Sequence, residues 1–151
     1  MFKSIVWAND GSEVAQRALP LVKELARPDG ATITIVHVVE RVEGSGGVGP
    51  TRRVDEPALQ AELERLAGEL QQEGFTVSLY INADVGARPA HEILKTVHEL
   101  GADLIIVGSH GHTIIGGLLL GSVAYRLLHV APCPVLVVPP ERKGSGGPAS
   151  G

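Results

Sequence analysis

Short runs of β-branched and aliphatic residues alternate along this chain with longer segments in which apolar residues recur every three or four positions. The first pattern predicts strands and the second predicts amphipathic helices. The predicted strands are residues 4–8, 31–39, 75–81, 103–108 and 134–138. The predicted helices are Ser12–Ala26, a segment from about Asp55 to Gly74, a segment from Pro89 to Gly101, and Ser122–Val130. This alternation predicts an α/β domain with one open five-stranded parallel sheet and helices on both of its faces.

Prolines and glycines refine the boundaries of these elements. Pro20 lies inside the first predicted helix, which should therefore kink or start late. Asp55 is a plausible N-cap for the second helix, and Pro57 suits its first turn. The Gly-rich and charged segment 40–53 is predicted to be a mobile loop. Residues 1–140 should form one domain, followed by a disordered tail at 141–151.

Composition narrows the classes of function. The chain has 151 residues, a formal net charge of −4 and no basic stripe, which argues against binding to nucleic acid or to an anionic membrane. The single cysteine, Cys133, excludes an intramolecular disulfide and suits a reducing compartment. The N-terminal segment meets polar residues too soon for a signal peptide, and no apolar run reaches the roughly 20 residues of a membrane span. We therefore expect a cytoplasmic protein.

The connection between the fourth strand and the fourth helix carries the clearest chemical signal. It contains five glycines and is longer than the roughly 2–6 residues usual for a βα loop. It ends at a helix start, where unpaired N–H groups and the helix dipole favour an anion. We expect the amides of Gly108, Gly111 and Gly121 to grip a phosphate chain, with the Ser122 hydroxyl as a further donor. No lysine follows these glycines, so backbone dipoles and a bound Mg²⁺ would have to balance the phosphate charge.

Simpler interpretations stand beside this one. The glycine connection could be only flexible, and the Asp10 carboxylate could cap the turn at Ser12 as well as meet a ligand. His110 and His112 lack a third ligand nearby in sequence, so no metal site is predicted, and His110 should lie beside the phosphates or face solvent. His37 should be a core or site-lining residue. Cys133 should be a packed thiol.

Three segments of this chain resemble one family. The spacing Gly108-x2-Gly111-x9-Gly121-Ser122 is similar to the nucleotide-binding signature of the universal stress proteins. The flanking ADLIIVGSHG and PCPVLVV, and Asp10-Gly11-Ser12 after the first strand, are also typical of that family. The resemblance extends from Lys3 to Pro139, while Trp7 and Asn9 depart from the pattern. It implies a sheet of strand order 3-2-1-4-5, as in the adenine nucleotide α-hydrolase-like fold.

The resemblance also implies site residues and a ligand, an adenine nucleotide and specifically ATP with Mg²⁺. Asp10 would meet the adenine or ribose edge, and the backbone of Val38 would meet the adenine. Five residues would hold the phosphates and the ribose: Gly108, Gly111, Gly121, Ser122 and Val123.

The implied function is a nucleotide-responsive regulator, in which ATP would order the glycine connection and the 40–53 loop. The resemblance implies a homodimer formed through the edge of the fifth strand, at Val135, Leu136, Val137 and Val138. One alternative is a slow ATPase, since the glycine connection holds no Arg or Lys for fast phosphoryl transfer. Another is a dimeric scaffold that binds no nucleotide.

Overall fold

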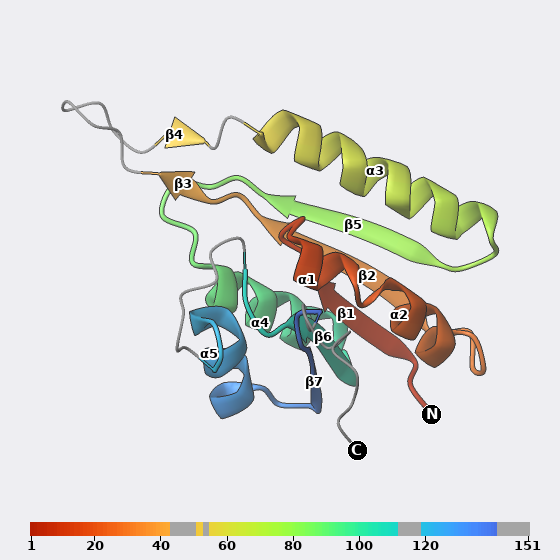
Figure 1. Cartoon of the computed structure of the whole chain (residues 1–151). Coiled ribbons are helices and arrows are strands. Elements are labelled where there is room, and N and C mark those ends of the chain that lie inside the picture. The colour runs from red at the N-terminus through yellow and green to blue at the C-terminus, as the bar shows by residue number, and fades with distance from the viewer. Residues whose placement is uncertain (43–50, 53–54, 112–118, 142–151) are drawn as a thin grey trace, which may run out of the picture.

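The computed structural model describes residues 1–42, 51–52, 55–111 and 119–141. Its main feature is a five-stranded parallel sheet of order β5-β2-β1-β6-β7 (Figure 1). The strands are β1 (Ser4–Ala8), β2 (Thr32–Val38), β5 (Val77–Asn82), β6 (Leu104–Gly108) and β7 (Val135–Val138). Taken in chain order along this sheet, they give the predicted order 3-2-1-4-5. The predicted fold class is confirmed.

Helices cover both faces of the sheet. They are α1 (Glu13–Gln16), α2 (Leu19–Ala26), α3 (Glu56–Gln72), α4 (Pro89–Leu100) and α5 (Ser122–Val130). Helices α2 and α3 lie on one face, whereas α4 and α5 lie on the other (Figure 1).

Strand β1 shows how the sequence builds two cores from one sheet. Successive side chains of a strand point to opposite faces. Ile5 and Trp7 therefore join the core beneath α2 and α3, while Val6 and Ala8 join the core beneath α4 and α5. All four side chains are buried, as the continuous apolar run predicts for a strand covered on both sides.

The segment predicted as one helix, Ser12–Ala26, is two helices. Ser12 is the N-cap of α1, and its Oγ accepts a hydrogen bond from the Ala15 N–H at 3.2 Å. Pro20 lies in the first turn of α2, where a helix has no use for its missing N–H. The expected late start is therefore correct for the second of the two helices.

One prediction about the next segment is wrong, and another is confirmed for the position of the residue only. The predicted loop 40–53 contains a short antiparallel pair, β3 (Arg41–Val42) with β4 (Thr51–Arg52), and its residues 43–50 and 53 lie outside the described residues. The segment is rich in glycine and charged residues, which are typical of loops, and of its described residues only two near each of its ends pair as strands. Asp55 does occupy the N-cap position of α3, but its side chain makes no capping hydrogen bond. Of the predicted tail, residues 142–151 also lie outside the described part of the chain.

A buried acid–base pair joins β2 to the first turn of α3. The His37 Nε2 lies 2.6 Å from the Glu56 Oε1, and the two side chains are only 2% and 1% exposed. Gln60 Nε2 donates to the same carboxylate oxygen at 2.9 Å. His37 is thus a core residue that faces α3, between two neighbours on β2 that face the opposite side of the sheet.

We expect this pair to be strongly coupled energetically. Removing one partner of a buried pair costs about 3–5 kcal/mol because the other group is left desolvated and unpaired. His37→Ala and Glu56→Ala should each lower the free energy of unfolding by about that amount, and the double variant should lose clearly less than the sum. Urea unfolding followed by the fluorescence of the single buried Trp7 measures this. Glu64→Ala, an exposed change on the same helix, is the control. Additive losses would contradict the coupling.

Candidate functional site

A pocket of about 320 Å³ opens at the carboxyl ends of the central strands. It lies where the chain leaves β1 toward one face of the sheet and leaves β6 toward the other, which is where open parallel sheets bind ligands. Its volume is at the lower end of the range usual for small-molecule sites. All seven site residues predicted from the sequence line it: Asp10, Val38, Gly108, Gly111, Gly121, Ser122 and Val123.

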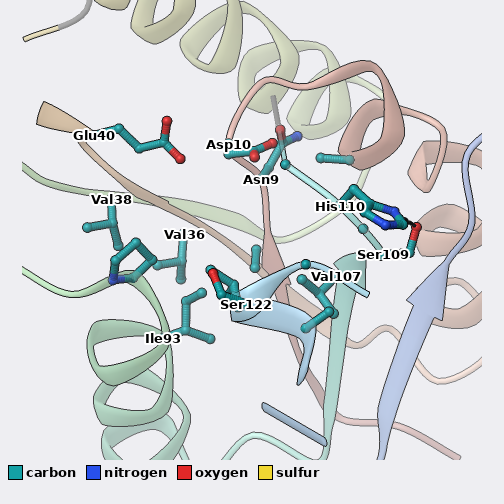
Figure 2. Close-up of a pocket in the computed structure, with 18 residues that line it drawn as sticks. Asn9, Asp10, Val36, Val38, Glu40, Ile93, Val107, Ser109, His110 and Ser122 are labelled. Atoms are coloured by element: carbon teal, nitrogen blue, oxygen red, sulfur yellow. Dashed lines mark hydrogen bonds between the residues drawn. The ribbon is translucent and has the colours of Figure 1, made fainter. Parts of the chain in front are cut away.

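One side of the pocket is apolar. Val36 and Val38 of β2 and Ile93 of α4 line this side together (Figure 2). Pro89 at the start of α4 also lines the pocket. Alternation along β2 places these two valines on the pocket side, with His37 on the other. Such a surface suits a flat, weakly polar group better than a charged one.

The turn after β1 is built by its own side chains. The Asn9 Oδ1 accepts a hydrogen bond from the Gly11 N–H at 2.8 Å, and the Asp10 Oδ1 accepts one from the Ser12 N–H at 2.9 Å. The Asn9 N–H donates to the Val36 carbonyl at 2.9 Å, which ties this turn to β2. Asp10 therefore has the turn-forming role that the sequence left open, in addition to its place on the pocket wall. Asn9, an atypical residue here, is 1% exposed and shapes the same turn.

Gly11 is favoured by its backbone conformation and lies against the Leu59 side chain of α3. Its φ of +77° lies in the left-handed region, and a Cβ there would stand 1.7 Å from the Leu59 Cδ1. The turn that presents Asp10 to the pocket is thus held against α3.

The glycines of the signature are crowded by the protein itself. A Cβ on Gly108 would approach the Val14 Cγ1 to 2.9 Å, and one on Gly111 would approach the Asp10 Oδ2 to 2.9 Å. The Gly121 N–H donates to the Ser109 carbonyl at 2.6 Å. This corrects one expectation, because an amide already bonded inside the fold cannot also be the predicted phosphate donor.

The backbone N–H groups that have no acceptor within their helix follow Gly121 directly, in the first turn of α5. Gly121 occupies the N-cap position and supplies no capping side chain, and the first helical hydrogen bond runs from the Tyr125 N–H to the Gly121 carbonyl at 3.0 Å. The N–H groups of Ser122, Val123 and Ala124 belong to the first turn, where a helix offers no acceptor of its own. All three residues line the pocket, so its polar end carries the positive end of a helix dipole.

Two lining residues form a contact that the sequence did not predict. The Ser109 Oγ lies 2.9 Å from the His110 Nδ1, and the side chains are 5% and 8% exposed. His110 thus lines the pocket as a buried residue and does not face solvent. His112 lies outside the described residues, and within the part of the chain that the structure describes no three His, Cys, Asp or Glu side chains gather as a metal site.

The charged groups on the pocket wall are acidic. Asp10 and Glu40 both line it, and the described lining residues include no Lys or Arg. Sequence reasoning missed Glu40, although its position two residues beyond the end of β2 was a usable signal, since the carboxyl ends of parallel strands share one edge of the sheet.

Cys133 is partly buried against the α4 and α5 core, and this burial, together with the Asp103 carboxylate, raises the pKa of its thiol. It is the packed thiol that was predicted.

The universal stress protein family matches residues 1–139. The chain belongs to this family. A universal stress protein of Thermus aquaticus is 37% identical over 141 residues, which is 91% of this chain and 99% of that one. The universal stress protein MJ0577 of Methanocaldococcus jannaschii is 32% identical, with 96% and 98% of the two chains aligned.

Solved structures agree with the fold. The structure of MJ0577 superposes with a TM-score of 0.77 at 29% identity, over 95% of this chain and 99% of that one. A universal stress protein of Archaeoglobus fulgidus, solved in complex with dAMP, superposes with a TM-score of 0.61 at 25% identity, over 91% and 98%. None of the described helices is both long and apolar enough to cross a membrane.

We expect Gly108 to matter for stability before any ligand is present. Gly108→Ala would force its new methyl against Val14 and the neighbouring backbone, and should lower the free energy of unfolding by about 1–3 kcal/mol. Gly68→Ala is the matched control, because it lies within α3 with open space around it and should stabilise by about 0.5–1 kcal/mol. Urea unfolding without nucleotide checks both. Equal effects of the two changes would show that the crowding at Gly108 is unimportant.

Proposed function

We propose that this protein binds an adenine nucleotide in the pocket between β1 and β6, specifically ATP with Mg²⁺, and acts as a nucleotide-responsive regulator. The observation that carries the proposal is the arrangement of one pocket with two unlike ends. An apolar wall from β2 and α4 faces the base, and the open first turn of α5 faces the phosphates. A relative of the same fold was solved in complex with dAMP, which supports an adenine nucleotide as the ligand class.

The individual roles follow from this orientation. The backbone of Val38 meets the adenine at the end of β2, and Asp10 accepts a hydrogen bond from the ribose or the adenine edge. The first-turn amides of Ser122 and Val123, with the Ser122 hydroxyl and the backbone at Gly111, hold the phosphates. Gly108 and Gly121 contribute space and close packing at the same wall.

Mg²⁺ fits the donor set at the pocket. This ion is usually held by one or two carboxylates together with phosphate oxygens, and Asp10 and Glu40 supply carboxylates here. When bound it would balance phosphate charge that no Lys or Arg among the described lining residues can balance.

Binding is a better match to these residues than rapid catalysis. Fast phosphoryl transfer requires a positioned base and a cation at the transferred phosphate, and the described lining residues supply no Lys or Arg. Turnover should therefore stay below about one per second, an ordinary enzyme rate.

The regulatory proposal requires ATP to order two segments, the glycine connection after β6 and the 40–53 segment. Residues 112–118 of the first and 43–50 and 53 of the second lie outside the described residues.

Thermal melting with and without Mg-ATP tests the site. Ligand at about 100 times its Kd should add roughly 2.7 kcal/mol of stability to the wild-type protein. Gly121→Asp should abolish this gain, because it places a negative charge beside the open turn of α5. Gly121→Ala shares the crowding against Ser109 and His110 without the charge, so it should keep a larger share of the gain. A full response in Gly121→Asp would refute the proposed position of the phosphates. If the wild-type protein shows no response to Mg-ATP, the alternative of a dimeric scaffold that binds no nucleotide would be favoured.

We also propose that two copies pair through the outer edge of β7. The N–H groups of Ile105, in β6, and of Ser109, just after β6, donate to the carbonyls of Pro134 and Val138. The backbone groups of even-numbered residues along β7 therefore point toward β6. In a parallel strand the odd-numbered residues then direct their N–H and C=O groups to the free edge. Val135, Leu136 and Val137 are each partly exposed there, which is a surface suited to strand pairing.

Light scattering after size-exclusion chromatography should give about twice the chain mass of 15.8 kDa. Val137→Pro removes an outward N–H without touching a bond to β6, so it should weaken the dimer while the monomer keeps its fold. Leu136→Ala is the comparison, since it leaves every edge N–H in place. A wild-type monomer at micromolar concentration would refute this interface.

A further inference from the structure

Asn9 is the least exposed polar residue among the described residues that line the proposed nucleotide pocket. Its exposed fraction is 1%, and it follows β1 directly, next to Asp10 (Figure 2). Burying an amide side chain costs free energy unless its polar atoms are hydrogen-bonded. The partners of Asn9 therefore indicate what the site gains from it.

Both polar atoms of the Asn9 side chain have partners inside the fold. Its Oδ1 accepts a hydrogen bond from the Gly11 N–H at 2.8 Å, and its Nδ2 donates to the Gln16 Oε1 at 3.4 Å. The backbone N–H of the same residue donates to the Val36 carbonyl at 2.9 Å. Asn9 thereby joins the turn after β1 to the end of α1 and to β2.

The carboxylate of Asp10 lies between two sides of the pocket. Its Oδ1 accepts a hydrogen bond from the Ser12 N–H at 2.9 Å, within the turn after β1. Its Oδ2 lies close to Gly111, in the connection after β6, where an added Cβ would approach it to 2.9 Å. One oxygen thus holds the turn, while the other lies beside a connection that leaves a different strand.

The hydrogen bond between Asn9 and Gly11 closes a ring around Asp10. An asparagine side chain can accept from the backbone N–H two residues further on, and this fixes the backbone of the residue between them. Here that residue is Asp10, and Gly11 continues the turn with a φ of +77°. The direction of the Asp10 side chain therefore depends on an acceptor that its neighbour supplies.

We propose that Asn9 is a positioning residue of the nucleotide site, which acts by holding Asp10 so that its Oδ2 stays beside Gly111. The role applies whether the carboxylate meets the ribose, the adenine or Mg²⁺, because each of these contacts needs the oxygen at the pocket. This inference rests on the proposed nucleotide function. It gives a role to a residue that departs from the family pattern.

A double-mutant cycle on the Kd for Mg-ATP, measured by isothermal titration calorimetry, tests this role. Asn9→Ala removes the acceptor and should raise the Kd about tenfold, the size expected for one lost hydrogen bond at a buried site. Asp10→Asn keeps an oxygen for the Ser12 N–H but places an amide nitrogen where Oδ2 lies. In that background Asn9→Ala should raise the Kd by less than about twofold, because the group that Asn9 positions is gone.

Asn9→Ser is the matched variant. Serine is nearly as small as alanine and also loses the bond to Gln16, but its hydroxyl can accept from the Gly11 N–H more weakly than an amide oxygen does. It should raise the Kd only about threefold, and this rise should also disappear in the Asp10→Asn background. The serine variant carries the cycle by itself if the alanine variant does not fold.

A crystal structure of whichever Asn9 variant folds gives a check that needs no ligand. The Asp10 carboxylate should have left its place beside Gly111, and an unmoved carboxylate would overturn the positioning role. An equal rise in the Kd in both Asp10 backgrounds would also overturn it, while nucleotide binding itself stands. Failure of the wild type to bind Mg-ATP would overturn the proposed function, and this inference with it.

Discussion

The parallel pairing of β1 with β6 is the constraint on which the pocket depends. These two strands are neighbours in the sheet although about a hundred residues separate them in the chain, with Ile5 opposite Leu104 and Ala8 opposite Val107. After β1 the chain enters α1 and α2 on one face, and after β6 it leads to α5 on the other. Two connections that leave in opposite directions cannot fill the space between them. The cavity therefore follows from topology, and its chemistry follows from the residues at the strand ends.

The glycines at this edge serve the fold first. Gly11 leaves room for the Leu59 side chain, and Gly108 leaves room for the Val14 side chain. The Gly121 N–H donates to the Ser109 carbonyl. Each of these contacts is made between parts of the chain itself. The described glycines therefore shape this end of the sheet through packing and hydrogen bonding within the fold.

The spacing of apolar residues and the positions of glycine and proline were enough to predict the five strands and most helix boundaries, because β1 and β6 are apolar on both faces and Gly74 and Gly101 follow their helices in the left-handed region. The strand order was predicted from the family resemblance. The division of 12–26 was harder, since the apolar spacing of the two short helices stays in phase. The glycine spacing and the family resemblance together listed seven residues that the structure brings around one cavity. This reasoning missed Glu40, whose relevance depends on which strand ends are adjacent, and it misassigned the Gly121 amide, whose partner is a carbonyl twelve residues away. Spacing along a chain can name the members of a site, but hydrogen bonding within the fold decides which of their atoms remain available.

Strand β2 is anchored from both sides, and this bears on how the protein could respond to a ligand. Its Val36 and Val38 form the pocket wall, while His37 between them is held by Glu56 in the opposite layer. Sliding or tilting that wall would pull the imidazole out of a closely packed contact, so the sheet is a stiff reference frame for whatever enters the cavity. Under the regulatory function proposed above, a conformational response would therefore arise in the connections that border the sheet, while the strands keep their positions.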